Sequence, residues 1–441
     1  MIARRSILLF ASGDFAFNLY WQSINLYLLF FYIDVLALPP ATAGLVFMVG
    51  ALWDGVADLL TGVFAERTGV SYARMIAWLT VPLGMGFIWA FWGGMTSVGG
   101  LIAAQVLFRS FYAATNVPYA AWTGRLSAHS ATRTMLTGLR MTFGAAAAAA
   151  VAMGLPALAR LTASSPVLGY PRAAAMLAGL ATPILLLMAW RVPEPRRPAQ
   201  QTRRAEGPKL AALLRNRAFM LLNIAAAAGG AAAALLVQSV PYYFRYVAHD
   251  PGRGAQALAA MGVASALALP LWTALATRMG ARAAWLAATA LALASLAAAF
   301  VLGHTTADPM LSTVVPIVLA AIAFAGINLT AWSLLPDSLD WGEIQGQPRV
   351  EALAFGAFAF LQKAALAGAG MAIGAVYASN GFNAGVTQTA GTIASIRWLM
   401  LAGPGILILA SALAIAAHPL RRDTLATLGA RRDAAPTVRP A

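Results

Sequence analysis

The chain has 441 residues, of which 60% are hydrophobic and 10% are charged, with a mean hydropathy of +0.73 and a formal charge of +15. A soluble domain usually carries about 25% charged residues, so this composition excludes a soluble domain and indicates an integral membrane protein. The absence of cysteine excludes disulfides and thiolate metal sites, and four scattered histidines argue against a histidine metal centre.

Apolar segments recur along the chain at a length that suits a bilayer, because a hydrocarbon core of about 30 Å needs a helix of about 20 residues. The sequence predicts an all-α membrane protein with twelve transmembrane helices in two six-helix bundles. The predicted spans are 8–33, 41–64, 73–93, 97–122, 136–159, 173–190, 217–245, 255–277, 283–302, 310–335, 352–378 and 393–417.

One long polar connection, rich in arginine, separates the sixth span from the seventh. Asn116–Trp122 at the end of the fourth span resembles Asn328–Trp332 at the end of the tenth, which suggests two homologous halves. The predicted parts are an N-terminal bundle (1–190), a basic cytoplasmic linker (191–216), a C-terminal bundle (217–418) and a cytoplasmic tail (419–441).

Arginine and lysine are concentrated in the tails and loops on the side of the membrane that holds both predicted ends. By the positive-inside rule, we expect both termini in the cytoplasm, and the first helix is expected to be retained because no cleavage site follows it. The basic linker is interpreted as a topology determinant that contacts lipid headgroups, not as a nucleic-acid site.

The second predicted span contains two aspartates four residues apart, Asp54 and Asp58. Residues at this spacing share one face of a helix, so both carboxylates point the same way. Charges at bilayer depth are rare and usually functional, and a nearby Na⁺ or proton relieves the repulsion between two of them. The pair is therefore predicted to couple transport to an ion, and the alternative is a structural role in helix packing.

Other ionisable side chains inside the spans are few. Arg109, Tyr112 and Asn116 follow one another at helical spacing and form a polar stripe that should line a cavity. For Arg109 the alternative is an ion pair with Asp14 or with an aspartate of the second span. Asp14 itself is a further candidate with a structural alternative, and Lys363 lies too far from its span ends to favour snorkelling.

Five motifs in order resemble the glycoside–pentoside–hexuronide:cation symporters, a family of the major facilitator superfamily that includes melibiose permease. The motifs are Gly13-Asp14 with Asn18, Phe31–Val35, Trp53–Asp58, Asn116–Tyr119, and Asp337–Glu343 followed by Gly346, Arg349 and Glu351, with Lys363 at the family's spacing. The resemblance implies the major facilitator fold and alternating access by two bundles around a central cavity.

The resemblance also implies roles for individual residues. Asp54 and Asp58 would bind the coupling cation, and Lys363 would lie between the cation and substrate sites. Substrate would contact the residues Asn18, Tyr112, Asn116, Arg140, Lys363 and Arg109. The acidic and basic residues after the tenth span fall in a cytoplasmic loop and would form a gate, namely Asp337, Asp340, Glu343, Arg349 and Glu351.

Departures from the family pattern bear on the solute and on the ion. Asn18 and Asn116 replace two acids that bind galactoside hydroxyls, and Ala120 replaces an aromatic that stacks on sugar. Ala113 replaces a hydroxyl that helps to hold sodium, which favours H⁺ over Na⁺ slightly. The extra arginine, Arg109, leaves room for an anionic sugar such as a uronide.

The predicted function is therefore H⁺- or Na⁺-coupled symport of a sugar, glycoside or uronide in a bacterial inner membrane. The alternatives are transport of a lysolipid or other amphipathic solute, which Phe17, Ala113 and Ala120 would suit, and a membrane sensor that no longer transports. An enzyme is not expected, because the sequence shows no pairing of a nucleophile with a base that would suit catalysis. We expect no cofactor, no metal beyond a Na⁺ at Asp54 and Asp58, no nucleic-acid partner, contacts with membrane lipids, and a monomer.

Overall fold

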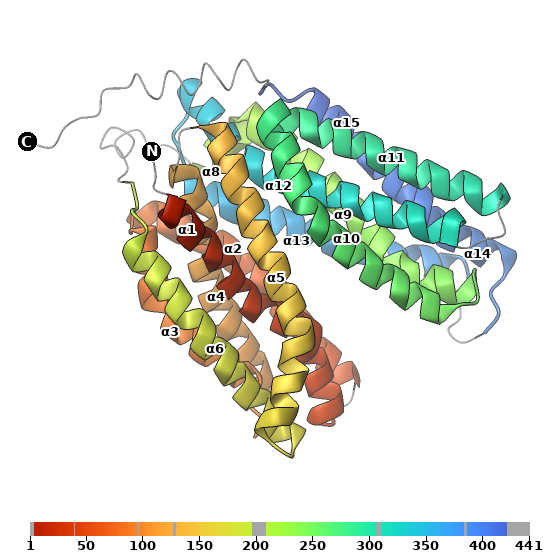
Figure 1. The fold of residues 1–441 in the computed structure, drawn as a ribbon, viewed down its shortest axis with the longest axis horizontal. Coiled ribbons are helices and arrows are strands. Elements are labelled where there is room, and N and C mark those ends of the chain that lie inside the picture. The colour runs from red at the N-terminus through yellow and green to blue at the C-terminus, as the bar shows by residue number, and fades with distance from the viewer. Residues whose placement is uncertain are drawn as a thin grey trace, which may run out of the picture. The chain divides into compact units, whose positions relative to one another are not determined.

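The computed structural model describes residues 4–38, 40–94, 97–126, 129–195, 209–305, 310–382 and 386–420. Within these ranges every regular element is helical, and Figure 1 shows the helices in chain order. The helices of the first half are α1 (Arg4–Ser23), α2 (Pro40–Thr68), α3 (Tyr72–Ala90), α4 (Val98–Leu126), α5 (Ser130–Thr162) and α6 (Pro166–Arg191). Two wider, π-type turns, η1 (Ile24–Leu28) and η2 (Phe31–Val35), continue α1.

The second half begins with a short helix, α8 (Lys209–Arg215), which lies inside the predicted linker. The remaining elements are α9 (Arg217–Tyr246), α10 (Pro251–Met279), α11 (Ala281–Thr305), η3 (Met310–Val314), α12 (Val315–Ile344), α13 (Glu351–Ser379), α14 (Ala390–Arg397), η4 (Trp398–Ala402) and α15 (Gly403–Ala416). Linker residues 196–208 and tail residues 421–441 lie outside the described residues.

Eleven helical segments among the described residues are long and apolar enough to cross a membrane. The first predicted span is helical from Arg4 to Val35 but is more polar, because Asp14, Asn18 and Gln22 follow one another along one face. Polar caps fix several helix starts: the Asn216 side chain accepts from the Phe219 amide at 3.1 Å, and the Thr389 side chain accepts from the Thr392 amide at 3.2 Å.

The predicted end of the tenth span is wrong. The tenth span was expected to end at Leu335 and to leave the following acids in a loop, but α12 continues to Ile344, so Asp337, Asp340 and Glu343 are helical. Asp337 and Asp340 are buried beside arginines, and these ion pairs stabilise the additional turns of helix.

The chain divides into two compact units whose boundaries are not those of the two sequence halves. The first consists of residues 1–128, 139–206 and 350–360, and the second of 129–138, 207–349 and 361–441. Each unit therefore contains the first turns of one helix from the other half: α13 begins in the first unit, and α5 begins in the second.

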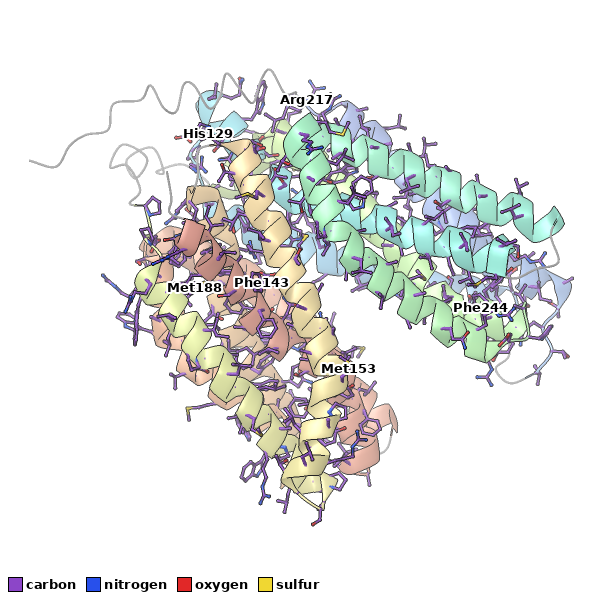
Figure 2. All side chains as sticks on the ribbon, viewed as in Figure 1. His129, Phe143, Met153, Met188, Arg217 and Phe244 are labelled. Atoms are coloured by element: carbon purple, nitrogen blue, oxygen red, sulfur yellow. The ribbon has the colours of Figure 1, made fainter. Side chains whose placement is uncertain are left out.

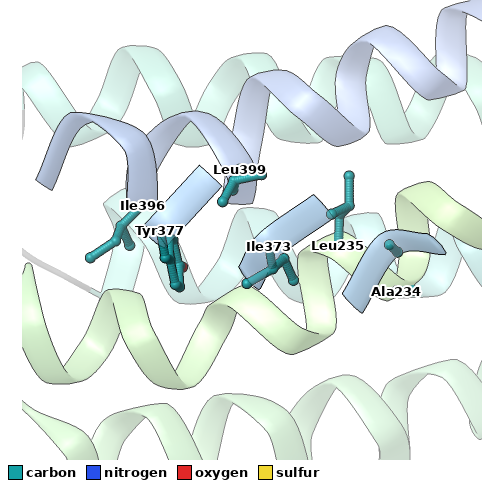
Figure 3. Packing of buried hydrophobic residues seen from close by; sticks show 7 residues of the cluster. Ala234, Leu235, Ile373, Tyr377, Ile396 and Leu399 are labelled. Carbon is teal, nitrogen blue, oxygen red and sulfur yellow. The ribbon is translucent and has the colours of Figure 1, made fainter. Parts of the chain in front are cut away.

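Each unit buries apolar side chains between its helices. In the first, aromatic rings pack between α1 and α4, with Phe10 stacked on Tyr119 at a centroid distance of 4.7 Å. In the second, aliphatic side chains of α9 and α13 pack against α14 and η4, including Leu235, Ile373 and Leu399 (Figure 3). Apolar side chains also point outward, as Met153 on α5 does with 74% of its surface exposed, which suits contact with lipid (Figure 2).

Candidate functional site

Two ion pairs of low exposure lie in the first unit, and the first joins α1 to α5. Arg140 donates to one Asp14 carboxylate oxygen from Nε at 3.1 Å and from Nη2 at 2.9 Å, and its Nη1 donates to the Thr123 hydroxyl at 2.6 Å. The guanidinium also lies 4.3 Å from the centre of the Tyr119 ring. Arg140 is thus held on three sides by α1 and α4.

Asn18 lies one helical turn after Asp14 and extends this polar face of α1. Its amide nitrogen donates to the Asp14 backbone carbonyl at 2.9 Å, and its amide oxygen accepts from Gln22 at 3.3 Å. Gly144 of α5 provides the space, because a Cβ built there would stand 2.9 Å from the Asn18 nitrogen and 3.2 Å from an Asp14 oxygen. The half-buried Asn18 amide therefore lies at a close approach of α1 and α5.

The second ion pair joins α4 to α2. Arg109 Nη1 lies 3.4 Å from an oxygen of Asp54, and each side chain is 2% exposed. Gln105, one turn earlier on α4, accepts from Arg109 Nε at 3.0 Å. The structure therefore realises the ion-pair alternative for Arg109, with an aspartate of the second span as its partner.

Aromatic rings enclose the Arg109 guanidinium. Its central carbon lies 5.7 Å from the Trp21 ring centre and 5.7 Å from that of Phe47. Trp21 also stacks on Tyr112, with centroids 5.3 Å apart and ring planes 25° apart. Sequence reasoning missed Trp21, although its position three residues after Asn18 and seven after Asp14 places it on the same face of α1.

The remaining predicted residues lie in α2, α4 and α13. Asp58, one turn after Asp54, is 4% exposed, and a Cβ built at Gly356 of α13 would stand 2.5 Å from its backbone oxygen. Asn116 is half-buried on α4, one turn after Tyr112. Lys363 is half-buried in the middle of α13, in a part of that helix that belongs to the second unit, so its relation to the acid pair stays a prediction.

The predicted gate residues fall into two charge networks, of which the first lies in the second unit. Arg133, in the first turn of α5, pairs with Asp337 and lies 2.8 Å from an oxygen of Asp340. Ser130 donates to Asp337 at 2.5 Å. Arg349 pairs with Asp340 and reaches Glu343 at 3.1 Å.

The second network lies in the first unit and fixes the start of α13. Arg125, at the end of α4, pairs with Glu351 and donates to Glu194 at 3.0 Å. Glu194 in turn accepts from the Tyr72 and Ala73 amides at 2.9 and 3.0 Å at the start of α3. In both networks, arginines around the α4–α5 connection meet acids around the α12–α13 connection.

The sequence profile of the MFS/sugar transport protein family matches residues 9–422. The chain belongs to this family. The inner membrane symporter YicJ of Escherichia coli is 25% identical over 92% of this chain and 89% of its own length. The isoprimeverose transporter of Lactiplantibacillus pentosus is 23% identical over 90% of this chain and 85% of its own length.

The fold agrees with this assignment. The structure of the proton:xylose symporter XylE bound to 6-bromo-6-deoxy-D-glucose matches with a TM-score of 0.68 and 14% identity, over 96% of this chain and 98% of that chain. The likeness confirms the predicted major facilitator fold of two six-helix bundles. The protein is an integral membrane transporter and not an enzyme.

The donor set around the second helix bears on ion binding by this transporter. Among the described residues, no three His, Asp or Glu side chains gather closely enough to hold a metal ion. A Na⁺ at Asp54 and Asp58 would therefore need further oxygens from the backbone or from hydroxyls, since hard cations take about six oxygen ligands or more. The Arg109 guanidinium already lies 3.4 Å from an oxygen of Asp54, which such an ion would need as a ligand.

Proposed function

We propose that this transporter is a cation-coupled symporter that carries a sugar or glycoside by alternating access. One observation carries the proposal: in one unit, buried carboxylates of α2 lie beside an arginine that also touches the half-buried aromatic and polar face of α1. Acids at this depth in a membrane mark ion pathways, and aromatic and amide side chains are the usual partners of sugar rings and hydroxyls.

In the proposed substrate site, Asn18, Trp21 and Asn116 remain partly accessible, and the buried Tyr112 stacks on Trp21. Asn18 and Asn116 offer both donor and acceptor atoms to hydroxyl groups, and Trp21 with Tyr112 offers an aromatic surface to a sugar ring. The name of the isoprimeverose transporter supports a sugar as the solute.

A neutral sugar suits this site better than a uronide. Arg109 and Arg140 both already face carboxylates, Asp54 and Asp14 respectively, so neither guanidinium offers an uncompensated charge to an anionic solute. Phe17, Ala113 and Ala120 are buried in helix contacts, so they do not support a binding surface for a lysolipid.

In the proposed cycle, a cation neutralises the remaining negative charge around Asp54 and Asp58, Lys363 reorients, and the solute then binds. The two charge networks act as the cytoplasmic gate, because α5 and α13 cannot move at their starts without separating Arg133 from Asp337 or Arg125 from Glu351. The basic loops favour cytoplasmic termini. The name of the inner membrane symporter YicJ supports a bacterial inner membrane as the location. We propose that the transporter functions as a monomer.

Counterflow into proteoliposomes would test the solute class. Purified protein is loaded with each unlabelled member of a panel of neutral glycosides, pentosides, uronides and lysolipids, and the exchange of its labelled form is followed. We expect exchange of a neutral sugar or glycoside. Exchange of lysolipid alone would overturn the proposal, and no exchange across the panel by folded protein would favour the non-transporting sensor.

The Asp58→Asn variant tests coupling separately from binding. It removes a buried charge that the coupling cation is proposed to neutralise, so accumulation against a gradient should be lost while exchange continues. Val56→Ala, a change on the exposed face of the same helix that introduces no polar group, is the control. Unchanged accumulation in Asp58→Asn would remove this acid from the mechanism.

A further inference from the structure

Arg109 places a fixed positive charge inside the predicted cation site. Its Nη1 lies 3.4 Å from an Asp54 oxygen at 2% exposure, and Asp54 is one helical turn from Asp58. A guanidinium remains protonated at every physiological pH, so this charge is permanent. The second-helix acids are therefore never without a positive neighbour in this arrangement.

The surrounding residues hold Arg109 in place. Gln105 accepts from its Nε, and Trp21 and Phe47 flank its guanidinium. Gly50, one turn before Asp54, makes room, because a Cβ there would stand 3.1 Å from Arg109 Nε and 2.8 Å from the Gln105 oxygen. A glycine on α2 and a glutamine on α4 thus both favour the inward position of the arginine.

This arrangement leaves one Arg109 group without a hydrogen-bond acceptor. Nη2 is buried and lacks such a partner, although the side chain is only 2% exposed. A buried charged donor without an acceptor is destabilising unless nearby negative charge compensates it. The compensation comes from the α2 carboxylates, which indicates that Arg109 and the acids form one electrostatic unit.

We propose that Arg109 is a tethered cation that takes the place of Na⁺ at the second-helix acids, so that this transporter does not bind Na⁺ there. The inference rests on the proposed coupled transport and specifies its ion. A Na⁺ would have to take an Asp54 oxygen from the guanidinium and would also face like-charge repulsion at close range in a low-dielectric site. Coupling then falls to the proton, which needs no ligand shell.

The charge balance agrees with a single coupling ion. Asp54 and Asp58 contribute two negative charges and Arg109 one positive charge, so the set carries one net negative charge when both acids are ionised. One proton, taken from water on one side of the membrane and returned to water on the other, would neutralise the set.

Na⁺ itself is the probe for the test. The purified full-length protein is heated in NaCl or in equal choline chloride, and the melting midpoint is compared for wild type, Arg109→Gln and Arg109→Lys. Wild type and Arg109→Lys, which both keep the charge, should show no Na⁺-specific shift. Arg109→Gln should gain a rise of several degrees, and adding Asp58→Asn should abolish that rise.

Two results would overturn the inference: Na⁺-specific stabilisation of wild type that Asp54→Asn removes, or folded Arg109→Gln that gains no Na⁺ response. If Arg109→Gln does not fold, Na⁺ stabilisation of wild type or Arg109→Lys overturns it, and insensitivity of both supports it. Uptake driven separately by H⁺ and Na⁺ gradients distinguishes the two proposals. Uptake driven by a Na⁺ gradient would contradict only the proposal that Arg109 takes the place of Na⁺. Uptake driven by neither gradient would contradict cation-coupled transport itself.

Discussion

Two nitrogens of Arg140 on α5, Nε and Nη2, donate to the same oxygen, Oδ1, of Asp14 on α1. This pair lies within the face that we assign to the solute, and it links the two helices whose polar side chains form that face. The arginine is therefore a positioning residue as well as a neighbour of the substrate.

Breaking this pair should destabilise the protein more than removing it altogether. Asp14→Asn leaves the Arg140 charge nearly buried, at 11% exposure, and a lone buried charge costs about 3–5 kcal/mol. The double variant Asp14→Asn with Arg140→Gln should recover part of that loss. The free energy of unfolding, measured by denaturant titration in mixed micelles, checks both. Equal losses in the single and double variants would contradict this account.

Gly144→Ala should weaken solute binding without unfolding the protein. The new methyl would meet the Asn18 amide at 2.9 Å and force that side chain out of its position, away from its hydrogen bonds to the Asp14 carbonyl and to Gln22. We expect the half-saturation concentration of the counterflow solute to rise by about tenfold, equivalent to about 1.4 kcal/mol. Gly154→Ala on the same helix meets nothing within 4 Å and should behave as wild type. Equal effects of both changes would remove Asn18 from the site.

Trp21→Ala should lower solute affinity, because it removes the aromatic surface that stacks on Tyr112. Aromatic contacts of this kind contribute on the order of 1 kcal/mol, so a loss of about five- to tenfold is expected, and Trp21→Phe should restore most of it. Trp190→Ala, a tryptophan with 71% exposure on α6, serves as the control. Unchanged affinity in Trp21→Ala would contradict the proposed stacking role.

The sequence predicted the features that depend on residues close together in the chain, and it did not predict those that depend on packing between distant helices. The apolar spans follow from the need to satisfy backbone hydrogen bonds in lipid, and the shared face of Asp54 and Asp58 follows from helix geometry alone. The sequence left open whether Arg109 contacts substrate or pairs with Asp14 or with an aspartate of the second span, because the rotation of α4 about its axis depends on packing against α2 and α1. Trp21 was missed because an aromatic in an apolar span is usually a core residue.

The end of α12 was misplaced for a related reason. Pro336 and the acids after it resemble a helix end followed by a polar loop. The partner that stabilises the additional turns, Arg133, is about 200 residues away in sequence, at the start of α5. No local pattern contains that information.

Arg133→Gln should open the network at the start of α5, because it leaves the buried Asp337 and Asp340 without this counter-ion. The chain has no natural cysteine, so Thr137→Cys, at a position that is 3% exposed on the same helix, can report the opening. Its maleimide labelling rate should rise by about tenfold or more if at least about 1.4 kcal/mol is lost.

Two controls accompany the labelling experiment. Met135→Cys, at a position with 37% exposure, should label at the same rate in both backgrounds. Glu343→Gln removes an acid with 32% exposure from the same network and should have a smaller effect, because water partly screens the Glu343 charge. Labelling of Thr137→Cys that does not respond to Arg133→Gln would show that this network does not hold α5 closed.

His418 makes the stability of the second unit depend on pH. His418 follows the end of α15 and is 2% exposed. Its Nε2 lies 3.4 Å from the hydroxyl of Ser338, the residue after Asp337 on α12. Burial, with a further effect of the positive charge of Arg282, lowers the pKa of His418 to about 4. The folded protein therefore binds fewer protons here than the unfolded chain, whose histidine has a pKa near 6.5.

Because of this difference, the contribution of His418 to stability is fully present above about pH 6.5 and declines as the pH falls toward 4, by up to about 3 kcal/mol. Below the folded pKa the decline should level off. His418→Gln keeps a polar side chain and removes the titration, so it should flatten this part of the curve of melting midpoint against pH. If His418→Gln and wild type lose stability in parallel between pH values of about 6.5 and 4, another group is responsible for the acid sensitivity.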